Sequence, residues 1–142
     1  CCSGNPSHDN DCNRSIPFEI FREIICEGME YFLLQKEIRA GDVKELELTA
    51  GITIPEILDF EDTACLVSMM DLIVTVDTSI AHLAGALGKE VWVLLPWVPD
   101  WRWQLDRQDS DWYASVRLLR QSEDRSWSRV LQEARELLLN RI

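Results

Sequence analysis

Residues 71–96 read DLIVTVDTSIAHLAGALGKEVWVLLP and set the architecture of the chain. Leu72 to Val76 is a short, β-branched apolar run, which is typical of a strand covered on both faces. Asp77-Thr78-Ser79 provides side chains for a turn and a helix N-cap, and the Ala- and Leu-rich run Ile80 to Leu87 predicts a helix. Val91 to Leu95 is a second buried strand. The stretch therefore predicts a βαβ unit, and in open α/β sheets ligands bind beyond the carboxyl ends of the strands.

The turn after the first of these strands carries side chains suited to an anion. A helix N-terminus has unpaired N–H groups and the positive end of a dipole, so it favours a phosphate. Thr78 and Ser79 add hydroxyl donors, and His82 lies one turn into the helix on the same side. A plainer interpretation is that Asp77 or Thr78 only caps the helix and that His82 is a structural histidine. The spacing alone favours neither interpretation.

Residues 77–89, DTSIAHLAGALGK, resemble the D-T-[SG]-x-x-H-x-A-[AG]-[AS]-x-G-x-P segment of heptosyltransferase-like glycosyltransferases. Glu90 stands where that family usually has Pro. In the family this segment lies in the C-terminal half of a GT-B fold and binds the diphosphate of a nucleotide-sugar donor. The most similar members are bacterial proteins that place such a domain behind tetratricopeptide repeats. The resemblance implies donor-diphosphate contacts by Asp77, Thr78, Ser79 and His82, with His82 as the candidate for a catalytic role.

A second strand–loop–helix unit precedes the first one. Cys1 and Cys2 read as the end of a strand, and the polar residues that follow predict a loop. A helix then carries an apolar stripe over residues 18–25, with Ser15 as its cap and Gly28 at its end. The loop of this unit is again expected at the edge of the sheet where ligands bind.

The same loop resembles the repeat-linked glycosyltransferases through its pattern S-G-N-P-x-H-x-x-D-x-x-R-S-I-P. The resemblance implies that Arg14 contacts the donor phosphate, since its planar donor fork suits that group. It places Ser3, Gly4 and Asn5 at the same edge. The alternative for Arg14 is a surface ion pair with Asp9 or Asp11, and His8 is either a ligand contact or a loop hydrogen bond.

The middle of the chain predicts three further elements. Residues 30–35 form a strand that leaves Lys36 at its carboxyl end, and residues 39–53 are irregular apart from the strand-like residues 46–48. Asp59 or Asp62 caps a helix that runs to residue 70. The family resemblance implies nucleobase, ribose or sugar contacts in this region, and the candidates are Lys36, Leu58 and Asp62. A solvated lysine, capping and core packing are equally good explanations.

Four of the six tryptophans lie in residues 97–113, with two prolines and several charges. An irregular aromatic segment of this length is more often functional than accidental. Its pattern is typical of the repeat-linked glycosyltransferases, which makes Trp101 and Arg102 candidates for sugar contacts. The alternative is a Trp-rich minicore that holds the segment in place. A strand over residues 116–120 and a helix over residues 127–140, started by Asp124 or Ser126, complete the chain.

Composition excludes several classes of protein. The net charge of −11 argues against a nucleic-acid binder, and no apolar run reaches the roughly 20 residues needed to span a bilayer. Five irregularly spaced cysteines do not indicate a disulfide framework, and the spacing of Cys1, Cys2, His8 and Cys12 matches no common zinc site. We expect reduced thiols, a cytoplasmic location, no metal and no cofactor other than the nucleotide-sugar co-substrate.

Together these observations predict one domain over residues 1–142, a fragment of a longer protein. The expected fold is α/β and Rossmann-like, with a mostly parallel sheet of about five or six strands and helices on both faces. The resemblance implies the donor-binding half of a metal-independent hexosyl- or heptosyltransferase. Its acceptor site and general base would lie in a missing N-terminal half, so the fragment alone would be inactive. The alternatives are a non-catalytic interaction module with the same fold and, less well supported, a hydrolase that uses His82 with Asp77.

Overall fold

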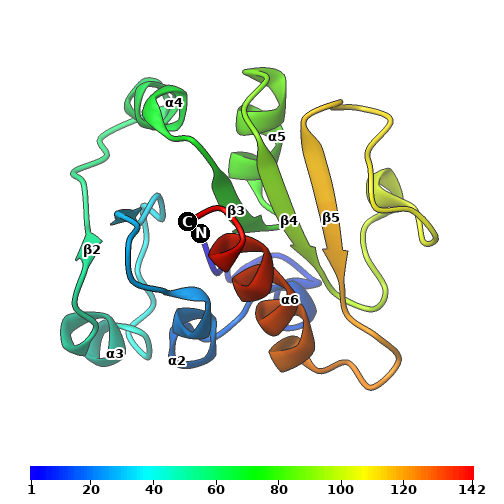
Figure 1. Cartoon of the computed structure of the whole chain (residues 1–142), viewed down its shortest axis with the longest axis horizontal. Coiled ribbons are helices and arrows are strands. Elements are labelled where there is room, and N and C mark those ends of the chain that lie inside the picture. Colours follow the sequence, from blue (N-terminus) through cyan, green and yellow to red (C-terminus); the bar gives the residue numbers. More distant parts are fainter.

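The computed structural model describes all 142 residues and has an α/β fold (Figure 1). A parallel sheet contains β3 (Ile73–Val76), β4 (Val91–Leu95) and β5 (Val116–Arg120), in that order, with Ile73 opposite Val91 and Val91 opposite Val116. A second, parallel pair consists of β1 (Tyr31–Phe32) and β2 (Ile52–Thr53). The helices are α1 (Asp11–Arg14), α2 (Phe18–Phe21), η1 (Arg22–Ile24), α3 (Val43–Leu48), α4 (Phe60–Met69), α5 (Ser79–Ala86), η2 (Trp101–Trp103) and α6 (Trp127–Leu139).

The βαβ unit predicted for residues 71–96 is confirmed. It consists of β3, α5 and β4, and its boundaries differ from the expected ones by one residue at most. The strands are parallel, and every residue of β4 is buried. The apolar, β-branched composition therefore identified these strands correctly, because both of their faces are covered.

The N-terminal residues join the two strand groups into one arrangement. Cys1 N–H donates to Val74 O (2.8 Å), and Val76 N–H donates to Cys1 O (3.0 Å), which is the pattern of a parallel pair. On the other side, Ser3 N–H donates to the Gln35 side-chain oxygen at 3.2 Å. The spatial order is β2, β1, residues 1–3, β3, β4 and β5. This is the order 3-2-1-4-5-6 of dinucleotide-binding folds, and its direction reverses between residues 1–3 and β3.

The structure has fewer regular strands than the five or six predicted. β1 and β2 contain two residues each, and residues 1–3 are linked to β1 through a side chain rather than a backbone ladder. Of the strand predicted over residues 30–35, the structure assigns only Tyr31 and Phe32, and Leu33 N–H still donates to Thr53 O at 2.9 Å. The sheet assigned by hydrogen bonding divides into one of two strands and one of three.

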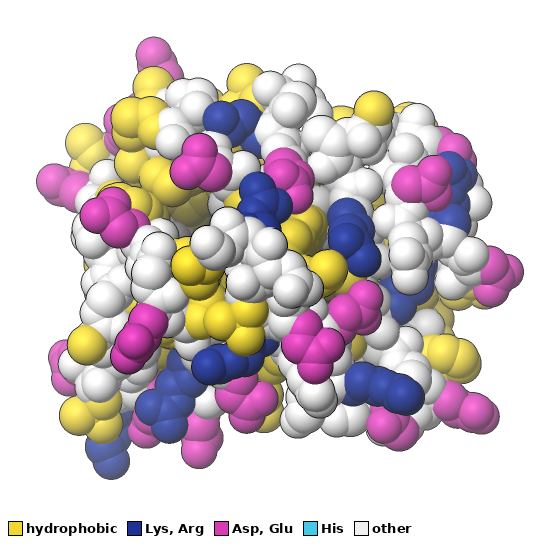
Figure 2. Space-filling view, viewed as in Figure 1, with side chains coloured by type: hydrophobic (Ala, Val, Ile, Leu, Met, Phe, Trp, Pro, Cys, Tyr) yellow, Lys and Arg dark blue, Asp and Glu magenta, His cyan; other side chains and the backbone are white.

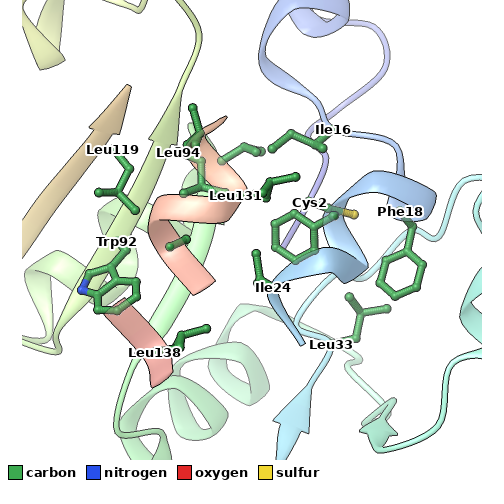
Figure 3. Close-up of a cluster of buried hydrophobic side chains, with 14 of the residues drawn as sticks. Cys2, Ile16, Phe18, Ile24, Leu33, Trp92, Leu94, Leu119, Leu131 and Leu138 are labelled. Atoms are coloured by element: carbon green, nitrogen blue, oxygen red, sulfur yellow. The ribbon is translucent and has the colours of Figure 1, made fainter. Parts of the chain in front are cut away.

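The core lies on both faces of the sheet, as predicted. Alternate residues of β4 enter different clusters: Trp92 and Leu94 lie on one face, and Val91, Val93 and Leu95 on the other. Figure 3 shows the first cluster, in which Leu131 and Leu138 of α6 meet Ile24 and the strands. The second cluster contains Ile80, Ala81 and Ala84 of α5, with Val67 of α4.

Three local expectations are corrected. Residues 46–48 are helical, because they form the end of α3. The helix after Pro17 is short and continues as a 3-10 turn that ends at Ile24, not at Gly28. Ser15 does not cap it: Ser15 Oγ donates to Asp11, and the first free N–H of the helix, that of Phe18, donates to Asp42 Oδ1 at 2.9 Å.

Other ends of helices follow the expected chemistry. Asp59 caps α4, and Asp62 reciprocates in a capping box. Asp124 Oδ1 accepts from Ser126 N–H immediately before α6.

None of the helices has the length and apolar character required to cross a lipid bilayer. Acidic and basic side chains are interspersed on the face seen in Figure 2, without a region of a single sign.

An ion pair joins the end of α6 to the start of β4. Arg141 Nη1 lies 2.6 Å from Glu90 Oε1, which also accepts from Trp92 Nε1. The hydrogen bond from Arg141 holds the pKa of Glu90 below its usual range. A carboxyl whose pKa is lowered by folding stabilises the protein above its unfolded pKa of about 4.3, and this stabilisation is lost as the pH falls through the folded pKa.

We therefore expect Arg141→Gln to raise the pKa of Glu90 and to reduce the loss of stability between neutral and acidic pH. Carboxyl carbon NMR titration would follow Glu90, and urea unfolding at several pH values would measure the stability. Arg129→Gln is the matched control, because Arg129 lies on α6 outside this ion pair. An unchanged Glu90 titration in Arg141→Gln would contradict the prediction.

Candidate functional site

A cleft of about 820 Å³ lies at the position where the strand order reverses. Its walls come from the loop after residues 1–3, the turn after β3, residues 96–100 after β4, and residues 121–127 after β5. These segments all follow the carboxyl ends of parallel strands. The cleft is therefore at the edge where the sequence predicted ligand binding, and its volume suits a small-molecule ligand.

The N-terminus of α5 forms one wall. Thr78 is the N-cap, and its hydroxyl accepts from Ile80 N–H at 3.3 Å and lies 3.2 Å from Thr75 Oγ1. Of the two caps considered from the sequence, Thr78 is thus the one used. Asp77, Thr78 and Ser79 all line the cleft, and the Ser79 side chain is exposed. Ala81 N–H donates to Thr78 O at 3.0 Å, so among the first three N–H groups of α5 the one that remains available to a ligand is that of Ser79.

Arg14 crosses from the N-terminal loop to this turn. Its Nη1 donates to Asp77 O at 2.8 Å, and its Nε lies 3.7 Å from Asp11 Oδ1. Only 11% of the side chain is exposed, and Nε is buried without a hydrogen-bond partner. A Cβ atom on Gly4 would lie 2.5 Å from Arg14 Nη2, so the guanidinium rests against bare backbone. The ion pair with Asp11 exists, but it is largely buried and lies beside the cleft.

Arg39 holds Asp11 from the other side, and sequence reasoning missed it. Arg39 Nη2 lies 2.6 Å from Asp11 Oδ2 and 3.1 Å from both Gly4 O and Ser15 Oγ. No local pattern indicated this contact, because Arg39 begins a segment interpreted as an irregular linker. One buried carboxylate between two guanidinium groups fixes the loop that carries Arg14.

His82 is held from the side of the aromatic segment. Its Nδ1 lies 3.1 Å from Tyr113 Oη, and its ring stacks on Trp103 with centroids 5.2 Å apart. Trp103 is 1% exposed, so the minicore interpretation is correct for this residue. His82 also lines the cleft. His82 therefore has both roles considered from the sequence: its ring is held by contacts within the protein, and it also faces the cleft.

Two further arginines line the cleft. Arg102 is paired with Asp100 at 2.8 Å, whereas Arg125 is exposed and has no carboxylate within ion-pair distance. Arg125 also has a φ of +55°, an uncommon conformation for a residue with a side chain. Sequence reasoning did not single out Arg125, although its place just beyond a predicted strand end was a usable signal. With Arg14, the cleft has three guanidinium groups in a chain of net charge −11.

The remaining predicted residues lie outside the lining of this cleft. Ser3 is buried, and Gly4 and Asn5 belong to the loop beside the cleft. Lys36 Nζ donates to Leu58 O at 2.5 Å, and Leu58 N–H donates to Asp62, so these three residues do come together. Trp101 is 69% exposed and packs edge-on against Trp112, while Arg102 lies over its ring.

No group of three or more His, Cys, Asp or Glu side chains is placed to hold a metal ion. Cys12 is exposed and lines the cleft, and Cys2 is buried, where desolvation raises the pKa of its thiol.

Residues 34–94 match the model of glycosyltransferase family 9 (heptosyltransferase). The matched residues include β3, the turn at Asp77 and all of α5, whereas Arg14 and the aromatic segment lie outside them. Comparisons with curated proteins and with solved structures found no match. Over residues 34–94 the chain is therefore similar to the family 9 glycosyltransferases, and this similarity supports a heptosyltransferase-like glycosyltransferase.

Proposed function

We propose that the cleft binds the diphosphate of a nucleotide sugar, and that the chain is the donor-binding half of a GT-B glycosyltransferase. One observation carries the proposal. The N-terminus of α5 and the imidazole of His82, both on α5, line the same cleft as the guanidinium of Arg14, which comes from the N-terminal loop. The similarity to a glycosyltransferase family over residues 34–94 gives this anion site its chemical context.

Each of these groups suits a leaving diphosphate. The N–H group and the hydroxyl of Ser79 donate to phosphate oxygens, and the helix dipole favours their charge. Arg14 supplies a fixed positive charge, because its side chain is already bonded to Asp77 O. Negative charge grows on the diphosphate as the glycosidic bond breaks, so donors aimed at it stabilise the transition state. Cationic side chains would thus stabilise the leaving group without a bound metal.

The sugar would be recognised in the cleft, and the nucleobase or ribose by a group of residues outside the cleft lining. Arg102 lines the cleft beside the aromatic segment, with Trp101 adjacent to it, and these residues suit the sugar. Lys36, Leu58 and Asp62 form a group near the start of α4 that suits the base or ribose. Ser3, Gly4 and Asn5 would support the phosphate loop rather than touch the ligand.

Transfer would require an acceptor site and a general base in addition to the donor site. In the proposed arrangement the acceptor hydroxyl and the general base belong to an N-terminal half, with tetratricopeptide repeats further upstream and a cytoplasmic location. The isolated chain is then expected to bind a nucleoside diphosphate weakly and to transfer no sugar. Turnover of a nucleotide sugar by the isolated chain would overturn this part of the proposal.

The test is a titration of the purified chain with UDP, ADP and GDP by calorimetry. We expect saturable binding of one of them, and binding of the matching nucleoside at least tenfold weaker, because the diphosphate supplies most of the contacts. His82→Ala is expected to weaken binding by about tenfold, the equivalent of one hydrogen bond to a charged group. Arg22→Ala, which removes an exposed ion pair outside the cleft, is the matched control and should bind normally.

A second candidate function is a non-catalytic interaction module. Exposed apolar side chains concentrate in the segment after β4, and they include Trp97, Val98, Trp101, Leu105 and Trp112. Such surfaces often mark protein contacts. If no diphosphate binds a folded chain, or its longer parent protein, the interaction module becomes the better explanation.

A further inference from the structure

A tyrosine behind the cleft holds the histidine inside it. Tyr113 Oη lies 3.1 Å from His82 Nδ1, and Tyr113 is not one of the residues that line the cleft. His82 Nε2 makes no hydrogen bond within the protein, and it is not one of the buried polar atoms that lack a partner. The two nitrogens therefore have different surroundings: Nδ1 is engaged from behind, and Nε2 is open to a ligand.

Two ring contacts, in addition to the hydrogen bond at Nδ1, fix the plane of the imidazole ring. Trp103 stacks on it with an angle of 20° between the planes, and the ring of Tyr113 meets it edge-on at 5.8 Å. The ring of Tyr113 rests on the backbone of α5, because a Cβ atom on Gly85 would lie 2.5 Å from its Cγ. Gly85 lies one turn after His82 on α5, so the packing of the Tyr113 ring on Gly85 places the Tyr113 hydroxyl beside Nδ1.

The direction of the Tyr113–His82 hydrogen bond decides what His82 offers to a ligand. Tyr113 Oη makes no other hydrogen bond, so its proton is free to be donated. If Oη–H donates to Nδ1, the imidazole proton lies on Nε2. Three arginines (Arg14, Arg102 and Arg125) and two carboxylates (Asp77 and Asp100) line the cleft, so its cationic side chains outnumber the anionic ones and favour an anion. An anion is bound by a donor rather than by a lone pair.

We propose that Tyr113 is a positioning residue that fixes His82 as the Nε2–H tautomer, so that Nε2–H donates to an anionic oxygen of the ligand. The identity of that ligand, a nucleoside diphosphate, rests on the proposed function. The contacts of Tyr113, Gly85 and Trp103 hold the imidazole ring and engage Nδ1 whichever ligand binds. The assignment of the proton to Nε2 rests on the charge of the cleft lining.

The test is Tyr113→Phe, which keeps the ring on Gly85 and removes only the hydroxyl. Nitrogen NMR of the imidazoles is simple to assign, since the chain has two histidines and His82→Ala identifies the relevant signals. In the unaltered protein we expect an unprotonated, hydrogen-bonded Nδ1 and a protonated Nε2. In Tyr113→Phe the Nδ1 signal should move toward that of an unconstrained imidazole, and affinity for the bound diphosphate should fall by about tenfold.

Tyr31→Phe is the matched control, because the Tyr31 hydroxyl bonds to Cys26 N–H at 3.0 Å, outside the cleft lining. Gly85→Ala is a second variant and should move Nδ1 in the same direction by displacing the Tyr113 ring. An Nδ1–H tautomer in the unaltered protein, or identical nitrogen shifts in Tyr113→Phe, would overturn the proposal. If Nδ1 responds in both variants but UDP, ADP and GDP do not bind the unaltered chain, the positioning role stands and the proposed function fails.

Discussion

Replacing Arg14 by alanine is expected to weaken nucleoside-diphosphate binding by roughly 100-fold, the largest effect of any single change in the cleft. Hydrogen bonds to charged groups contribute about 1.5–3 kcal/mol each, and Arg14 offers a fork of donors that the surrounding loop already holds in place. Binding costs little conformational entropy at Arg14, because its side chain is hydrogen-bonded to Asp77 O before any ligand arrives. Calorimetric titration of the variant with the bound diphosphate measures the effect.

Two further variants separate charge from geometry at this position. Arg14→Lys keeps the charge but loses the planar fork, so its affinity should lie between those of Arg14→Ala and the unaltered protein. Asp11 retains its ion pair with Arg39 in both variants, which limits the disturbance of the loop. Circular dichroism and thermal unfolding check that the variants fold. Affinity within twofold of the unaltered protein in a folded Arg14→Ala would remove Arg14 from the proposed site.

Leu94→Ala is expected to lower the free energy of unfolding by about 2–5 kcal/mol. Leu94 is fully buried in β4 and faces the cluster formed with α6 and α2 (Figure 3). Removing its branched end leaves a cavity between the sheet and the helices packed on it. Because β4 is paired with a strand on each side, the surrounding structure cannot easily move in to fill the cavity. Since the total stability of a domain is about 5–15 kcal/mol, this change removes a large share of it. Urea unfolding followed by tryptophan fluorescence provides the measurement.

Leu105→Ala makes the same chemical change at a side chain that is 64% exposed. We expect it to change stability by less than about 0.5 kcal/mol, as is usual for exposed positions. A comparable loss in the two variants would mean that Leu94 does not occupy the packed interior described here.

The central part of the fold was readable from sequence because its signals are local. β3, α5, β4 and β5 are compact apolar runs with turn residues between them, and their predicted bounds differ from the observed ones by one residue at most. The positions of Thr78, Ser79 and His82 followed from the same reasoning, since a turn between a parallel strand and its helix lies at the carboxyl edge of the sheet. The fold class was therefore predictable.

The rest depends on contacts between distant parts of the chain. Residues 46–48 alternate like a strand but close a helix, and Asp42, remote from Phe18 in sequence, replaces Ser15 at the start of α2. Arg39 supports the loop that carries Arg14 from a segment without periodicity. Tyr113 reaches His82 only because the segment after β4 folds back over α5. No local sequence pattern predicts such contacts, because neither residue of a pair stands out from its neighbours in the sequence.

The side chains of Arg14 and Tyr113 pack directly on the backbone of two glycines, which makes the cleft sensitive to substitution of those glycines. Gly4 and Gly85 have no functional group, yet a methyl group on either would occupy space now filled by a guanidinium or a phenol ring. Replacing either glycine by a larger residue would displace the Arg14 or Tyr113 side chain. The variant would then behave as if that side chain were missing, although its residue is unchanged. Attempts to redesign this cleft, or to interpret natural variation in it, would need to treat each glycine and the side chain above it as one unit of two residues.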